Sequence, residues 1–193
     1  WNLEYMDYAL WEEHVNYFTL NTIKRLLNQY DFQIIHHETT LFSGKALTVF
    51  AQKYSCVNKK KLISENEMNA IQIYQKNWPI LKQRMQDILH TKNKTIVYGC
   101  GARSCTFVNF MELDMVQCYI DDQDEKQNLY VPGSKLKIRS WSDEMSENYF
   151  LLGVNTENEM KILQKRKPSK DQYISIQPPS RLLPNQWKEL INA

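Results

Sequence analysis

The spacing of apolar residues changes along the chain, and each change predicts a different kind of segment. In residues 19–30, a threonine that can cap a helix precedes apolar side chains at helical spacing: Leu20, Ile23, Leu26 and Leu27. Residues 32–37 and 46–51 are rich in residues that favour strands, and a turn containing Gly44 separates them. A helix and two strands cannot bury their own apolar faces, so we expect this segment to pack on something larger.

A long helix is predicted next, behind a polar, lysine-rich linker at residues 54–63. Ser64 and Glu67 have the spacing of a capping box. Apolar residues then recur every three to four positions to about residue 91, a stripe that is typical of a helix facing a core. Pro79 lies inside this stripe and predicts a kink or a break in the helix.

From residue 94 onward, strands and helices alternate. Strand patterns at residues 95–98, 116–120, 149–154 and 172–176, and a short one at 136–138, surround helical patterns at 103–113 and 156–164. This alternation predicts an α/β fold with a Rossmann-like parallel sheet. We therefore divide the chain into residues 1–55, a linker and long helix at 56–93, and a Rossmann-like domain at 94–193.

Composition excludes several classes of function. The 193-residue chain has a formal net charge of +2, which gives no global field for binding nucleic acid or a membrane surface. No apolar run is long enough to span a bilayer, and no signal peptide is visible. The four cysteines form no C-x₂-C pair and do not cluster with the histidines, so we expect reduced thiols, no metal site in this chain and a cytoplasmic protein.

The richest candidate site is the stretch KTIVYGCGARSC at residues 94–105, where a predicted strand meets a glycine-rich turn and a helix. Gly99 and Gly101 match the first two glycines of a dinucleotide-binding fingerprint, but Ser104 stands at the third. Asp121 follows Gly101 by 20 residues, where an acidic residue can hold a ribose hydroxyl, and Arg103 can contact a phosphate. A dinucleotide site and a plain strand-to-helix turn both remain open on this evidence.

Two weaker candidates lie elsewhere. In the sequence WEEH at residues 11–14, Glu13 is placed to orient the ring of His14, which is the arrangement of a general base. Asn155 follows a predicted strand, at the end where open α/β sheets bind ligands, although it is equally suited to cap the next helix.

In this order, the motifs resemble the S-adenosylmethionine-dependent sugar-nucleotide C-methyltransferases, which act on keto-deoxysugars. The family motif YGA-x-x-KG-x-x-x-LN corresponds to YGCGARSCTFVN here, and V-D-x-N-P-x-K-Q-G-x-x-x-P-G corresponds to IDDQDEKQNLYVPG. The strand end W-N-x-x-x-E fits Asn155 and Glu159, and Y-H-E-H-x-x-Y-F-S corresponds to WEEHVNYFT. The chain departs from these motifs at Trp11, Glu12, Ser104, Gln123–Asp124 and Asn128.

The resemblance implies roles for particular residues. Glu13 and His14 would belong to the base that removes the proton alpha to the ketone of the sugar. The Rossmann-like domain would bind a nucleotide-diphosphate sugar through Tyr98, Gly99, Gly101, Arg103, Asp121, Lys126 and Asn155. Residues 1–55 would be the end of a methyl-donor domain, whose S-adenosylmethionine loop is not in this chain.

The resemblance also implies an upstream zinc module, so we expect this chain to be the C-terminal portion of a longer enzyme or a shortened relative. Alone it should not transfer methyl groups. Its expected partners are a nucleotide-diphosphate sugar, the missing methyl-donor region or a second copy of itself. Two alternatives stay open: a non-catalytic Rossmann-like module that binds a nucleotide or a protein, and an NAD-dependent oxidoreductase, for which no second mononucleotide half is visible.

Overall fold

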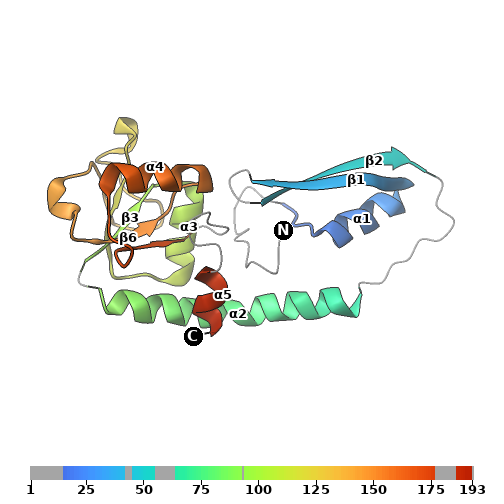
Figure 1. Cartoon of the computed structure of the whole chain (residues 1–193), viewed down its shortest axis with the longest axis horizontal. Coiled ribbons are helices and arrows are strands. Elements are labelled where there is room, and N and C mark those ends of the chain that lie inside the picture. Colours follow the sequence, from blue (N-terminus) through green and yellow to red (C-terminus); the bar gives the residue numbers. More distant parts are fainter. Residues whose placement is uncertain (1–14, 42–44, 55–63, 93, 177–185, 193) are drawn as a thin grey trace.

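A computed structural model describes residues 15–41, 45–54, 64–92, 94–176 and 186–192. Figure 1 shows a helix and a two-stranded hairpin at one end of the molecule, a parallel sheet with its helices at the other, and one long helix running beneath both. Within the described residues, no helix is long and apolar enough to cross a membrane.

The N-terminal part consists of α1 (Leu20–Gln29), β1 (Phe32–Leu41) and β2 (Lys45–Lys53). Thr19 caps α1 as predicted, and its side chain forms a reciprocal capping box with Thr22. The antiparallel pairing of β1 with β2 continues to Leu41 and Lys45, so both strands are longer than predicted. The ladder bonds are made by the backbone, and they therefore extend through the polar residues that ended the apolar pattern.

Helix α2 (Glu65–His90) is one continuous element, and the break predicted at Pro79 does not occur. Proline removes a bond to the carbonyl four residues earlier, at Gln75. Both residues are exposed, so water can satisfy that carbonyl. Before the proline, the buried Trp78 packs edge-on against Tyr74 and Phe110. After it, Leu81, Met85 and Leu89 are buried in the core, so the helix is held on both sides of Pro79.

Ser64 caps α2 as the capping-box pattern predicts, since its hydroxyl accepts the N–H of Glu67 at 3.2 Å. The carboxylate of Glu67, however, faces α1. It accepts a 2.7 Å hydrogen bond from Thr19 and lies 3.7 Å from Arg25. Glu67 is buried, so this contact ties the N-terminal part of the chain to α2.

The second part is a five-stranded sheet in the order β5-β4-β3-β6-β7, with every neighbouring pair parallel. Its elements are, in chain order, β3 (Thr95–Tyr98), α3 (Ala102–Met111), β4 (Val116–Ile120), the 3₁₀ turn η1 (Asp124–Lys126), β5 (Ile138–Arg139), the 3₁₀ turn η2 (Asp143–Met145), β6 (Tyr149–Leu152), α4 (Thr156–Arg166), β7 (Tyr173–Ser175) and α5 (Gln186–Asn192). The predicted Rossmann-like α/β fold is confirmed, although β5 lies later than the expected 136–138 and β6 ends before residues 153–154. Helix α5 was not predicted.

Alternate residues of each strand enter two different cores. Val97 and Tyr119 pack on the side of α2 and α3, together with Leu81, Met85 and Leu89 of α2. Ile96, Tyr98 and Ile120 pack on the other side, with Ile162 of α4. Figure 1 shows α4 on the face of the sheet away from α2. The sheet is therefore covered on both faces, as a parallel sheet requires.

The strand order creates a topological switch point between β3 and β6. The chain leaves β3 toward β4 and β5 on one side, and it returns on the other side to form β6 and β7. Open α/β sheets bind ligands in the crevice at the carboxyl ends of strands at such a point.

Candidate functional site

A pocket of about 520 Å³ lies at the switch point. Its walls are the loops that follow β3, β4 and β6 and one side of α4. Its lining residues are Tyr98, Gly99, Cys100, Gly101, Ala102, Arg103, Asp121, Asp122, Gln123, Lys126, Gly153, Val154, Asn155, Asn158, Lys161, Ile162 and Lys165. A pocket of this size falls in the range of small-molecule and cofactor sites.

Gly99 and Gly153 bring the loops after β3 and β6 into close contact. Gly99 has a φ of +101°, and a Cβ there would lie 2.6 Å from Val154 Cγ1 and 3.1 Å from the carbonyl of Gly153. Each glycine also bonds to a neighbouring strand: Gly99 donates to the carbonyl of Ile120 at 2.7 Å, and Gly153 to that of Tyr98 at 2.8 Å. Only glycine combines this conformation with this proximity.

Ser104 occupies the place of the third fingerprint glycine without entering the pocket. Its side chain is fully buried, and its hydroxyl accepts the N–H of Gly101 at 3.0 Å. The same hydroxyl lies 2.8 Å from the carbonyl of Gly99 and 2.9 Å from that of Gly101, so it can donate to one of them. The Cβ of Ser104 lies 2.7 Å from the position that a Cβ on Gly153 would occupy. The close packing of helix and strand that the third glycine provides in the fingerprint is here provided by Gly153.

Gly101 differs from Gly99. Its φ is −115°, and a Cβ on it would meet no heavy atom within 4 Å. Gly101 is the N-cap residue of α3, so the open space lies beside the N-terminus of that helix. A ligand can therefore approach this backbone closely.

Asp121 faces the glycine-rich loop from the end of β4. Its Oδ2 accepts the N–H of Cys100 at 2.8 Å and lies 3.3 Å from Lys126 Nζ, and its Oδ1 accepts the N–H of Gln123 at 3.0 Å. Lys126 Nζ also donates to the carbonyl of Cys100 at 3.0 Å. The contact to ribose that the sequence suggests for Asp121 stays a prediction, and any such contact would add to these bonds.

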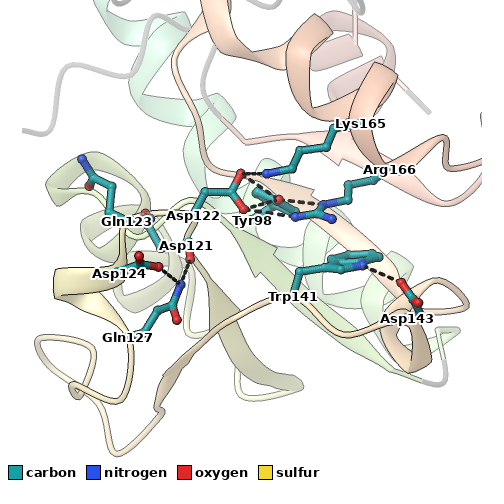
Figure 2. Close-up of polar contacts among 10 residues, drawn as sticks. All are labelled: Tyr98, Asp121, Asp122, Gln123, Asp124, Gln127, Trp141, Asp143, Lys165 and Arg166. Atoms are coloured by element: carbon teal, nitrogen blue, oxygen red, sulfur yellow. Dashed lines mark hydrogen bonds and ion pairs between the residues drawn. The ribbon is translucent and has the colours of Figure 1, made fainter.

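Asp122 points the other way and joins β4 to α4. Figure 2 shows its carboxylate between Lys165, Arg166 and the hydroxyl of Tyr98. Burial opposes the ionisation of Asp122, but the hydrogen bonds from Lys165 and Tyr98 and the charges of Lys165 and Arg166 outweigh it and lower its pKa. The Arg166 guanidinium also lies 4.3 Å from the centre of the Trp141 ring. This cluster forms one end wall of the pocket.

The Tyr98 hydroxyl belongs to this wall. It accepts a 2.8 Å hydrogen bond from Arg166 Nε and donates to Asp122. Burial raises the pKa of Tyr98 to about 12, although Arg166 acts against it. Tyr98 is therefore neutral at physiological pH and serves as a hydrogen-bonding group.

Two further cations complete the lining. Arg103, the second residue of α3, is buried at the pocket, and Lys161 of α4 donates to the neutral Asn158 side chain at 3.1 Å. Asn155 is the N-cap residue of α4, but its side chain makes no capping bond, so the alternative that this side chain caps the helix does not hold. The exposed Asn155 amide instead lines the pocket.

The structure brings together the predicted substrate-binding residues Tyr98, Gly99, Gly101, Arg103, Asp121, Lys126 and Asn155 in one pocket. Glu13 and His14 lie outside the described residues. The sequence analysis did not single out Asp122, Gly153, Lys161 or Lys165. Lys161 and Lys165 are four positions apart on a helix, which places them on one face, and this signal could have found them. In the described part of the chain, no group of three or more His, Cys, Asp or Glu side chains is arranged to hold a metal ion.

A comparison with protein families identifies this unit. The family model of the C-methyltransferase C-terminal domain matches residues 56–172. The chain belongs to this family. The match takes in α2, the glycine-rich loop, β4 and α4, so every lining residue of the pocket lies inside the C-methyltransferase C-terminal domain. Membership supports a methyltransferase. A search of curated proteins finds no sequence match.

We expect Gly153→Ala to destabilise the C-methyltransferase C-terminal domain by about 1–3 kcal/mol, because the new Cβ overlaps Ser104 Cβ. In a Ser104→Gly background that overlap is gone, so Gly153→Ala should lower the free energy of unfolding by less. Denaturant unfolding of the four proteins in this cycle measures the difference. An equal loss in both backgrounds would show that the two residues do not interact.

Alkaline pH should weaken the fold through two tyrosines. Burial raises the pKa of both Tyr98 and Tyr149 from 10.0 to about 12. Below pH 10 the folded and unfolded chains both keep these protons, so the full stability is present there. Between pH 10 and 12 only the unfolded chain releases them, and the free energy of unfolding falls.

An ultraviolet absorbance titration should then show a late phenolate phase that includes Tyr98 and Tyr149. Tyr149→Phe should lower the amplitude of that phase by one phenolate. A titration that is complete near pH 10 would contradict the burial of these two hydroxyls.

Proposed function

We propose that this chain is the C-terminal portion of an S-adenosylmethionine-dependent enzyme that C-methylates a nucleotide-diphosphate keto-deoxysugar. In this proposal, the pocket at the switch point holds the nucleotide diphosphate. The observation that carries it is the open space at Gly101, beside the N-terminus of α3 and within a cation-rich lining.

The chemistry of the lining favours an anion. The first N–H groups of a helix have no partner within the helix, and the helix dipole is positive at that end, so both attract a phosphate. Arg103 comes from this first turn, and Lys161 and Lys165 come from α4 across the pocket. Lys165 is bonded to Asp122, whereas the acceptor of Lys161 is the uncharged Asn158. A diphosphate between α3 and α4 would meet cations from both helices.

The same lining does not fit S-adenosylmethionine. The methyl donor is a sulfonium cation, and here it would meet Arg103, Lys126, Lys161 and Lys165. Both Asp121 and Asp122 already accept hydrogen bonds from cationic groups of the chain. We therefore place the methyl donor outside this pocket, in a region that precedes the C-terminal domain. In this proposal α1, β1 and β2 are the end of that region, which supplies the methyl group.

Carbon methylation of a ketosugar begins with loss of the proton alpha to the ketone, because the resulting enolate is the nucleophile. We assign that proton transfer to His14, with Glu13 orienting its ring. The assignment rests on the resemblance of the sequence WEEH to the family motif.

Isothermal titration of the chain with a nucleoside diphosphate tests the binding proposal. We expect wild type to bind, and Lys161→Met to weaken binding roughly tenfold through loss of a charge-assisted hydrogen bond. Gly101→Ser keeps a good N-cap residue but fills the open space, so it should fold normally and lose binding. Lys170→Met changes an exposed lysine that does not line the pocket, and it should bind like wild type.

Pyrophosphate, NAD and S-adenosylmethionine form the comparison series. Absence of heat with every nucleoside diphosphate would refute the proposed ligand. Tighter binding of NAD would favour the oxidoreductase alternative.

His14→Gln tests the base in the complete enzyme that includes the methyl-donor region. Exchange of the sugar's alpha proton with deuterated solvent, followed by NMR, should fall by about 10²–10⁴-fold, the usual contribution of a general base. Binding of the nucleotide-diphosphate sugar should not change. Near-normal exchange would remove His14 from the mechanism.

A further inference from the structure

The backbone of Cys100, in the middle of the glycine-rich loop, is held at both its N–H and its carbonyl. Its N–H donates to Asp121 Oδ2 at 2.8 Å, and its carbonyl accepts from Lys126 Nζ at 3.0 Å. Lys126 and Asp121 are themselves 3.3 Å apart, so the three groups form a closed ring of contacts. We call this ring the Cys100 clamp.

The loop needs such a clamp because Cys100 lies between two glycines. Glycine allows a wide range of backbone angles, and the bonds that Ser104 makes to Gly99 and Gly101 do not reach the polar groups of Cys100, which Asp121 and Lys126 hold. Gly101, the next residue, is the N-cap of α3. The backbone orientation of Cys100 therefore sets how the loop enters the helix.

Further hydrogen bonds hold Asp121, the acidic member of the Cys100 clamp, in place. Asp121 Oδ1 accepts the N–H of Gln123 at 3.0 Å, and the backbone carbonyl of Asp121 accepts the Gln127 side chain at 3.2 Å, a contact shown in Figure 2. The 3₁₀ turn η1 between these residues delivers Lys126 to the loop. The Asp121 side chain is only 9% exposed, against 34% for Lys126. A carboxylate this deeply buried requires its hydrogen bonds, and one of those that Asp121 accepts comes from the Cys100 N–H of the loop.

We propose that Asp121 and Lys126 are positioning residues. They fix the backbone N–H and carbonyl of Cys100, and through them the glycine-rich loop, in the shape that receives the diphosphate. Their effect on affinity rests on the proposed function, whereas their effect on the loop does not. The competing assignment makes them direct ligands, with Asp121 on a ribose hydroxyl and Lys126 on a phosphate. The two assignments predict different results.

Amide hydrogen exchange of the Cys100 N–H, measured by NMR on the chain without ligand, tests the clamp directly. Lys126→Met does not alter the acceptor of this N–H. If Lys126 positions the loop, exchange should nevertheless be roughly tenfold faster. Lys126→Arg, which keeps a cation able to reach both groups, should restore slow exchange. Lys161→Met, a change in the same pocket outside the clamp, should leave it slow.

The reactivity of the Cys100 thiol gives a second measure of the same opening. Cys100 is 7% exposed, so a thiol reagent should react faster with it when the loop is released. A Cys100→Ser variant identifies the part of the signal that belongs to this residue.

Titration with a nucleoside diphosphate then tests whether the Cys100 clamp supports binding. Removing a carboxylate charge beside an anionic ligand should tighten binding if charge alone matters. The clamp requires the opposite, so Asp121→Asn should weaken binding severalfold. The Asp121→Asn/Lys126→Met double variant should bind about as weakly as the worse single variant, because both changes release one loop. Two independent direct contacts would instead give losses that add, so the double variant separates the two roles.

Three outcomes decide the matter. Unchanged Cys100 exchange in Lys126→Met, or tighter binding by Asp121→Asn, would overturn the clamp. If wild type binds no nucleoside diphosphate, the proposed function fails, and the exchange experiment still decides the clamp.

Discussion

The close contact between Gly99 and Gly153 determines the shape of the site. A Cβ on Gly99 would strike Val154 and the Gly153 carbonyl, and a Cβ on Gly153 would strike Ser104. Gly99 and Gly153 directly follow β3 and β6, the neighbouring strands at which the chain changes direction in the sheet. Without side chains there, α3 can begin immediately above the strand ends, and the backbone at Gly101 faces open space. The pocket depends on this proximity more than on any single polar group.

This contact explains how the site accommodates a serine where the dinucleotide fingerprint has its third glycine. A side chain at Ser104 requires space on the facing strand, and the absence of one at Gly153 supplies that space. The Ser104 hydroxyl then bonds to the loop that it supports. The third glycine of the fingerprint provides space between helix and strand, and a glycine on the facing segment, here Gly153, can provide the same space.

The sequence predicts the sheet well because its signals are local. Residues 95–98 and 116–120 are short apolar runs that become fully or largely buried strands, and their bounds agree with β3 and β4. The start of α2 is likewise predicted by the Ser64 cap. Helix α5 has only seven residues, too few to show a helical pattern. Its apolar residues Leu190 and Ile191 pack against the core that includes α2, and this contact cannot be read from the local sequence. The continuity of α2 through Pro79 is supported by Trp78 packing on Phe110 of α3, which spacing along the chain does not reveal.

The polar residues of the site were predicted by position but not by partner. Asp121 and Asp122 are adjacent in the sequence, and beyond a strand end successive side chains point to opposite sides. Asp121 consequently reaches the glycine-rich loop, while Asp122 reaches Lys165 and Arg166 at the end of α4. The fingerprint spacing places Asp121 near the glycine-rich loop but does not give its bond to the Cys100 N–H, and no pattern in the sequence links residue 122 to residue 166. One dipeptide at the end of β4 therefore holds two separate walls of the pocket, the loop before α3 and the last turn of α4, at a fixed distance from each other.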